Sequence, residues 1–164
     1  MKFITQILIL FISITGFSQE TMSDLLKKHN TKSIPYISVQ ELAMPKTEAI
    51  ILDAREPKEY ETSHIKNAIH IGYNNFNIET ISRIIKNKDE QIVVYCSLGI
   101  RSENIAKKLK KAGYNNVYNL YGGIFEWKNK DFNVYNSEGT ETENIHVFSK
   151  KWNQWLTKGV KVYE

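Results

Sequence analysis

Cys96 is the residue of this sequence best suited to covalent chemistry. It is the only cysteine among the 164 residues, so neither an internal disulfide nor a multi-cysteine metal site is expected. A lone cysteine at the end of a strand is commonly a small buried hydrophobe. Here, however, the apolar run 91–95 precedes Cys96, and a polar loop, Gly99, Arg101 and a helix start follow it. This combination favours a nucleophilic cysteine.

The loop after Cys96 has the features of an anion-binding turn. A short connection from a buried strand to a helix directs successive backbone N–H groups inward, and the helix N-terminus adds positive partial charge. Such surroundings lower the pKa of a thiol from about 8.5 to about 7.5 or below. Gly99 permits the tight backbone path, and the Arg101 guanidinium offers several donors to an oxyanion. We predict that Cys96 is catalytic and that the substrate is bound by Ser97, Leu98, Gly99, Ile100, Arg101 and Ser102.

Other catalytic chemistries find less support in the sequence. No papain-like or caspase-like signature is present, which disfavours acyl transfer by the cysteine. The four histidines, His29, His64, His70 and His146, lack the spacing of metal ligands. We therefore expect no metal and no cofactor.

The elements that must position Cys96 alternate between strand and helix patterns. This alternation predicts an α/β fold with a mostly parallel central sheet and helices on both faces. In such sheets ligands bind beyond the carboxyl ends of the strands, where Asp53 and Cys96 fall. The expected strands are 36–38, 49–52, 68–71, 91–95 and 117–120, and the expected helices are 22–28, a brief one after Ser38, 57–62, 78–85 and 102–111.

The two ends of the chain have their own patterns. Residues 1–18 combine one lysine with a mostly apolar stretch and small residues at 16 and 18, the pattern of a secretory signal peptide, with an uncleaved anchor as the weaker alternative. We expect an exported protein, periplasmic or secreted, whose mature chain has no membrane span. Residues 136–164 are expected to form a polar linker and an amphipathic helix that packs on the domain. That helix would carry Phe148, Trp152, Trp155 and Leu156.

Composition sets further limits. With 41% hydrophobic and 12% aromatic residues the chain can form a packed core, which excludes a disordered or collagen-like protein. The net charge of +4 comes from basic residues spread along the sequence, so no nucleic-acid partner is expected.

Three blocks of the sequence resemble the rhodanese (thiosulfate sulfurtransferase) family in its single-domain form. The first runs from Asp53 to Ala68, the second is the loop from Cys96 to Ser102, and the third is Tyr121 to Trp127 with its Gly-Gly-x-x-x-Trp pattern. Ser63 departs mildly from the family, in which a glycine usually precedes the His-Ile pair. The resemblance covers residues 38–135 and implies a rhodanese-like three-layer fold. Residues 19–37 would then be an N-terminal extension.

The resemblance also implies roles for these residues. Cys96 would accept a sulfane sulfur and become a persulfide, with loop amides holding the outer sulfur and Arg101 binding the anionic donor. A supporting role around the pocket is implied for Asp53, Arg55, Glu59 and His64. Phosphatases and arsenate reductases of the same fold resemble a Cys-x5-Arg pattern, whereas this loop is Cys-x4-Arg and is one residue too short to surround a phosphoryl group.

The expected function is that of an exported sulfurtransferase. It would take sulfur from thiosulfate or another sulfane-sulfur donor and pass it to cyanide, a small thiol or a partner protein's cysteine, because the chain has no second cysteine to receive it. The aliphatic pair Leu98 and Ile100 predicts only modest affinity for thiosulfate. The alternative is a sulfur-carrier or anion-binding module without turnover, and a phosphatase is the third possibility.

Overall fold

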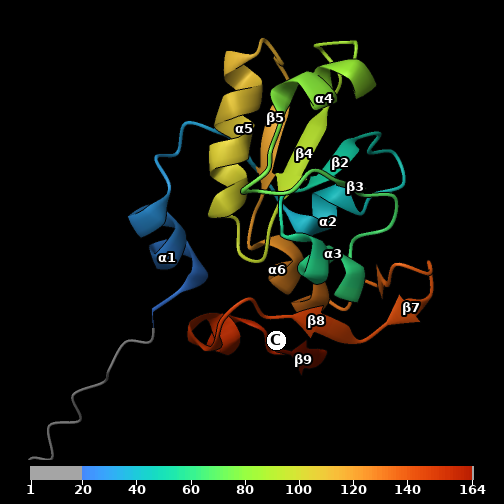
Figure 1. Cartoon of the computed structure of the whole chain (residues 1–164). Helices are drawn as coiled ribbons and strands as arrows, with labels where there is room; N and C mark the ends of the chain where they lie inside the picture. The colour runs from blue at the N-terminus through green and yellow to red at the C-terminus, as the bar shows by residue number, and fades with distance from the viewer. Residues whose placement is uncertain (1–19, 164) are drawn as a thin grey trace, which may run out of the picture.

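The computed structural model describes residues 20–163, and the expected signal peptide lies outside them (Figure 1). A parallel five-stranded sheet forms the centre, with the strand order β1-β5-β4-β2-β3. The alternation of strand and helix patterns is thereby confirmed as a parallel α/β fold. The strands are β1 (Tyr36–Ile37), β2 (Ile50–Asp53), β3 (Ile69–His70), β4 (Ile92–Tyr95) and β5 (Val117–Leu120), each within one or two residues of its expected bounds.

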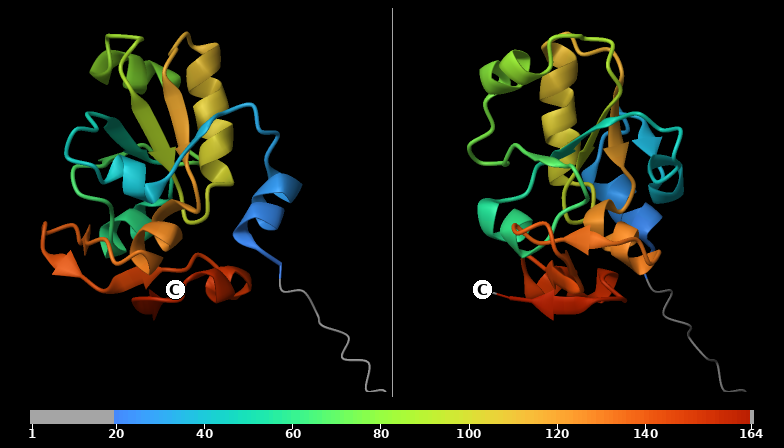
Figure 2. Two further views of the ribbon diagram at one scale, coloured as in Figure 1. Left: turned by 180° about the vertical axis from the view of Figure 1, so that it is seen from behind. Right: turned by 90° about the vertical axis from the view of Figure 1, so that its right-hand side faces the viewer.

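Helices cover both faces of the sheet. Figure 2 shows α4 (Ile78–Ile84) and α5 (Arg101–Lys111) on one side and α2 (Val39–Leu42) on the other. Because successive residues of a strand face opposite sides, the fully buried β4 contributes to two cores. Ile92 and Val94 pack with the α4 and α5 face, whereas Val93 and Tyr95 pack with α2 and α6 (Gly123–Asn129). The three-layer fold is therefore present.

Two further helices lie close to the site. The helix α1 (Met22–His29) begins with a capping box in which Thr21 and Asp24 bond each other's backbone N–H groups. The helix α3 (Pro57–Thr62) begins with a proline at its first position, where no backbone donor is needed. The Glu56 N–H donates to Oε2 of Glu59 at 3.0 Å, which fixes that side chain at the start of α3.

The C-terminal segment differs from its expected form. The expected linker contains β7 (Glu141–Thr142), which pairs antiparallel with β6 (Val134–Tyr135). The expected amphipathic helix is instead a 3₁₀ helix, η1 (Lys150–Trp155), between the parallel strands β8 (Asn144–His146) and β9 (Val160–Val162). Residues three apart lie on one face of a 3₁₀ helix as well as of an α-helix, so the spacing of the aromatic residues could not distinguish the two helix types.

The same segment crosses the end of the sheet at which the strands finish. In Figure 1 it lies beneath α3 and α6, at the carboxyl ends of the strands. Ile145, Val147 and Leu156 are buried in the core shared with β4 and α6. Among residues 20–163, no helix has the length and apolar character needed to cross a membrane.

Candidate active site

Cys96 directly follows β4 and is one of the residues that line a cavity. Its side chain is only 2% exposed, yet it lines a cavity of about 290 Å³ together with Ser97, Leu98, Ile100 and Arg101. The Gly99 N–H donates to the sulfur at 3.1 Å, and the Ser102 hydroxyl lies 3.5 Å from it. Of the loop residues expected to bind substrate, Gly99 and Ser102 thus contact the sulfur, whereas Ser97, Leu98, Ile100 and Arg101 line the cavity.

The surroundings of Cys96 favour its thiolate. Burial alone would raise the pKa of the thiol, but the charge of Arg101 and the hydrogen bonds from Ser102 and Gly99 act in the opposite direction and more strongly. The net effect is a pKa below the ordinary thiol value of 9.0. These contacts therefore favour the ionised form of Cys96.

Two buried amides that sequence reasoning missed hold Gly99 in place. The Asn119 side chain donates to the Gly99 carbonyl at 2.8 Å, and Asn30 donates to the same oxygen at 2.9 Å. They fix a glycine with φ of +102°, whose N–H points at the sulfur. Ser102 donates to Asn119 at 2.7 Å. A polar residue inside the apolar strand 117–120 could have marked Asn119, whereas no sequence signal marks Asn30.

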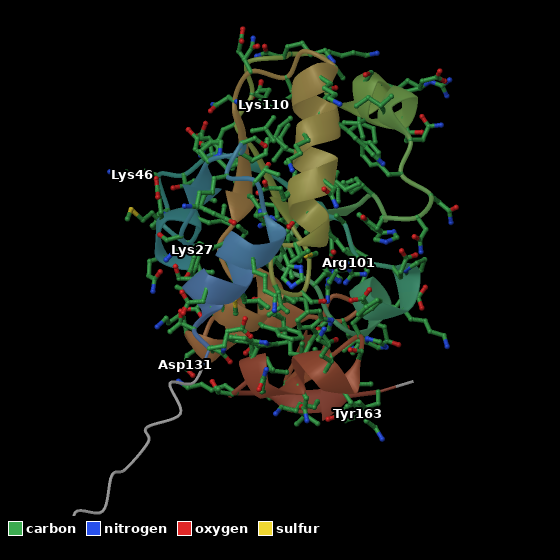
Figure 3. The ribbon with its side chains drawn as sticks, turned by 90° about the vertical axis from the view of Figure 1, so that its left-hand side faces the viewer. Lys27, Lys46, Arg101, Lys110, Asp131 and Tyr163 are labelled. Atoms are coloured by element: carbon green, nitrogen blue, oxygen red, sulfur yellow. The ribbon has the colours of Figure 1, made fainter. Side chains whose placement is uncertain are left out.

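Arg101 is bound to a carboxylate in addition to facing the cavity. Its guanidinium makes two hydrogen bonds to Glu59, at 2.7 and 2.6 Å, and a third to the Ser97 hydroxyl at 3.0 Å. The Ser97 hydroxyl also donates to Glu59 at 3.0 Å. Figure 3 shows Arg101 at the start of α5, on the side where α3 and the C-terminal segment lie. Glu59 thus links α3 to the loop.

Asp53 and Arg55 form a second buried ion pair beneath the site. The Arg55 guanidinium contacts Asp53 at 2.6 Å and the Ser63 carbonyl at 2.6 Å, and neither charged side chain is exposed. Tyr95 donates to Asp53 at 2.6 Å from the last position of β4. The pair therefore ties the end of β2, the end of α3 and the strand β4 that precedes Cys96 into one unit.

His64 lies away from the sulfur. Its ring stacks on Tyr60 with centroids 4.1 Å apart, and its backbone exchanges two hydrogen bonds with Tyr135 of β6. These contacts tie the segment after α3 to β6. Within the described residues, no cluster of three or more His, Cys, Asp or Glu side chains is arranged to hold a metal ion.

The start of α6 holds the loop from below. The Ile124 N–H donates to the Cys96 carbonyl at 2.9 Å, and the Phe125 N–H donates to the Ser97 carbonyl at 3.2 Å. A Cβ at Gly123 would overlap the Cys96 carbonyl oxygen and come within 2.7 Å of that of Ser97. The second glycine of the block 121–127 is therefore required by this close backbone approach.

The cavity walls include residues that sequence reasoning did not assign to the site. Tyr73 and Asn74 come from the segment after β3, and Phe148 and Trp152 come from the C-terminal segment. Leu98, one of the residues predicted to bind the substrate, lines the cavity and is at the same time almost wholly buried in the core. Spacing along the chain gave no signal that these distant segments meet above Cys96.

Comparison with known proteins identifies the class. Residues 38–130 match the sequence model of the rhodanese-like domain. The chain belongs to the rhodanese-like domain family.

Solved structures share this fold. A rhodanese-related protein from Thermoplasma volcanium is 27% identical, with a TM-score of 0.53 over 61% of this chain and 96% of its own. A thiosulfate sulfurtransferase from Pseudomonas aeruginosa is 24% identical, with a TM-score of 0.57 over 73% of this chain and 22% of its own, and that likeness shows the fold alone.

Curated relatives match over part of their length. A tRNA uridine(34) hydroxylase from Erwinia tasmaniensis is 37% identical over 83 residues, which are 49% of this chain and 24% of that protein. The protein of the same name from Aster yellows witches'-broom phytoplasma is 33% identical over 119 residues, 70% of this chain and 37% of its own. This chain therefore spans about a quarter to a third of the length of these relatives.

Proposed function

We propose that this protein is a sulfurtransferase in which Cys96 carries the transferred sulfur as a persulfide. The supporting observation is that Cys96 lines a cavity while its sulfur accepts a hydrogen bond from the Gly99 N–H and the pKa of its thiol is lowered. A thiolate in such a site is a nucleophile at neutral pH. The match to the rhodanese-like family supports sulfur chemistry in general.

The proposed reaction has two steps. The Cys96 thiolate attacks the outer sulfur of a donor such as thiosulfate, the donor's sulfur–sulfur bond breaks, and sulfite leaves with the bonding electron pair. An acceptor such as cyanide then attacks the outer sulfur of the persulfide and leaves as thiocyanate, which restores the thiolate. The loop N–H groups stabilise the negative charge on the outer sulfur. The acceptor is external because the chain has one cysteine.

Mass spectrometry of the intact protein after incubation with thiosulfate tests this proposal. We expect one added sulfur atom, located on Cys96, which is lost when cyanide is added and thiocyanate appears. The Cys96→Ser variant should gain no sulfur. Sulfur that stays on Cys96 without turnover for every acceptor would support a carrier module instead, and no sulfur on Cys96 with any donor would contradict the proposal.

The activity named for the curated relatives belongs to proteins much longer than the matched region. For this chain we propose the sulfur chemistry of the shared domain rather than hydroxylation of tRNA. The spread of its basic residues along the sequence supports this choice. Modification of uridine in tRNA incubated with the purified chain would contradict it.

We further propose that the protein is exported. The support is the sequence of residues 1–18 alone, with its lysine, apolar stretch and small residues at the cleavage position. Cell fractionation combined with N-terminal mass analysis tests this, since export predicts a processed chain beginning near Gln19. An unprocessed chain in the cytoplasmic fraction would contradict the proposal.

A further inference from the structure

The C-terminal segment builds part of the wall above Cys96. Phe148 and Trp152 line the cavity, and both lie outside residues 38–130, the part matched to the rhodanese-like family. Together with Tyr73, Leu98 and Ile100 they give the cavity a mainly apolar and aromatic lining. A donor that reaches the sulfur must therefore pass between these side chains.

The charges around the cavity offer little net attraction to a dianion. The Arg101 guanidinium is paired through two hydrogen bonds with the buried Glu59 carboxylate, so the two side chains together add no net charge that would attract a second anion beside the Cys96 thiolate. The Phe148 ring covers it, with the guanidinium carbon 4.4 Å from the ring centroid. Glu56 adds a second carboxylate to the cavity wall. Thiosulfate carries two negative charges and no apolar surface, so this lining suits it poorly.

Phe148 is held in its position by its own backbone. Its φ is +58°, which is uncommon for a residue other than glycine, and its N–H donates to Nδ1 of the buried His146 at 3.1 Å. On the other side, η1 carries Trp152 and is followed by the buried Leu156. The backbone that carries each aromatic ring is thus anchored next to a buried residue, which holds the two rings along the cavity wall.

We infer that the site selects organic sulfane-sulfur donors, in which the transferred sulfur is attached to an apolar, aromatic-sized body. This inference rests on the proposed sulfur transfer and names the donor class. The cavity of about 290 Å³ has room for such a body, since an apolar cavity of about 150 Å³ already holds benzene. Phe148 and Trp152 are then the residues that determine donor specificity.

Benzenethiosulfonate serves as the probe for this donor class. The Cys96 thiolate attacks its outer sulfur, the sulfur–sulfur bond breaks, and benzenesulfinate leaves with the electron pair. Methanethiosulfonate undergoes the same reaction and has the same charge, but carries a methyl group instead of the phenyl ring. The pair therefore isolates the contribution of the apolar body from that of the charge.

The test measures the rate of Cys96 persulfide formation in the full chain with benzenethiosulfonate, methanethiosulfonate and thiosulfate. Each rate is divided by that of a small free thiol with the same donor, which removes differences in intrinsic reactivity. We expect the corrected rate for the phenyl donor to exceed that for the methyl donor by about tenfold or more. The corrected rate for thiosulfate should be the lowest of the three.

Substitutions in the cavity wall then test whether Phe148 and Trp152 cause the preference for the phenyl donor. We expect Phe148→Ala and Trp152→Ala each to reduce the phenyl-to-methyl ratio several-fold, and Phe148→Leu, which keeps an apolar side chain, to reduce it less. Phe148 is 48% exposed, so its replacement removes little of the core, whereas Trp152 is partly buried against the core. Tyr163→Ala is the matched control: it removes a ring that is 45% exposed and lies on the same segment but not in the cavity wall.

The outcomes separate the inference from the function on which it rests. Equal corrected rates for all donors, or a ratio unchanged by both Phe148→Ala and Trp152→Ala, would overturn the donor class while leaving sulfur transfer intact. Absence of sulfur on Cys96 with every donor would overturn both. A higher corrected rate for thiosulfate than for the phenyl donor would also reject the inference.

Discussion

Arg101 acts on two partners within the site. Its charge lowers the pKa of Cys96, and its guanidinium donates two hydrogen bonds to Glu59. Because Glu59 also bonds Ser97, the position of the guanidinium beside the loop is fixed from α3. The nucleophile and its stabilising charge are therefore set by contacts from separate parts of the chain.

Removal of the Arg101 charge should raise the pKa of Cys96. In Arg101→Gln the thiolate loses a nearby positive charge, so we expect the midpoint of its alkylation rate against pH to move to higher pH. Alkylation by iodoacetamide at a series of pH values measures this. Arg83→Gln, which changes an exposed arginine on α4, should leave the midpoint in place. An unchanged midpoint in Arg101→Gln would show that the backbone N–H groups alone set the pKa.

Glu59 should make the stability of the protein depend on pH in the acid range. Burial alone would raise the pKa of this carboxyl, but the hydrogen bonds and charge of Arg101 and the charge of Arg55 hold it below the ordinary value of 4.5. The unfolded chain then binds the proton more readily than the folded one. The stabilisation is present above pH 4.5 and is lost as the pH falls through the lowered value.

Urea unfolding of Glu59→Gln at several pH values tests this. At neutral pH we expect a loss of about 3 kcal/mol in the free energy of unfolding, because the nearly buried Arg101 loses its charged partner. Below pH 4.5 the stability of the variant should change less with pH than that of the wild type. Glu61→Gln, on the exposed side of α3, should behave as the wild type. Parallel pH profiles for wild type and Glu59→Gln would contradict the assignment.

At the scale of elements, the start of α6 is the support of the Cys96 loop. Its first amides bond the carbonyls of Cys96 and Ser97, and Gly123 lets the two backbones approach. The block 121–127 thus acts on the nucleophile without contributing a side chain to the cavity wall. We interpret its glycine pair as a packing requirement of the loop.

Gly123→Ala should damage both the fold and the loop. The new Cβ would overlap the Cys96 carbonyl. We therefore expect the free energy of unfolding to fall by about 1–3 kcal/mol more than it does when a glycine with positive φ and free space around it is replaced by alanine. Gly139→Ala supplies that comparison, since Gly139 has φ of +75° and no atom near its Cβ position. We expect this change to lower the free energy of unfolding by about 1 kcal/mol. Thermal unfolding and the Cys96 alkylation rate measure both effects. Equal behaviour of the two variants would contradict the support role.

At the scale of the whole molecule, the C-terminal segment is part of the main core. Ile145, Val147 and Leu156 pack in the same cluster as Val93 and Phe125, on the face that carries α6. The wall of the cavity and the core of the domain therefore depend on the same stretch of chain. This argues for a single cooperative unit.

Native-state hydrogen exchange should detect that unit. Val147 is buried, and its N–H donates to the Val162 carbonyl at 3.0 Å. We therefore expect the protection of this amide against exchange to lie within about tenfold of that of the β4 amides. The Gly139 N–H, in an exposed turn, should exchange much faster. Fast exchange at Val147 with slow exchange in β4 would show that the segment opens separately.

The local sequence determined the central sheet and marked Cys96 as the candidate nucleophile. The apolar run before Cys96 predicts β4, and Pro57 and Gly113 mark helix ends that the structure contains. These patterns act over a few residues, because strand and helix periodicity and turn chemistry are local properties. The Cys-x4-Arg spacing of the loop is likewise visible in the local sequence.

Tertiary structure alone decided how that nucleophile is surrounded. Asn30 and Asn119 meet at Gly99 from opposite parts of the chain, and Phe148 reaches Arg101 from beyond the matched domain. No local sequence pattern indicates either contact, because each depends on which distant segments the folded core brings to one edge of the sheet. The sequence thus marked Cys96 and the loop groups that lower its pKa, whereas long-range packing decided what holds that loop and which distant residues wall the cavity.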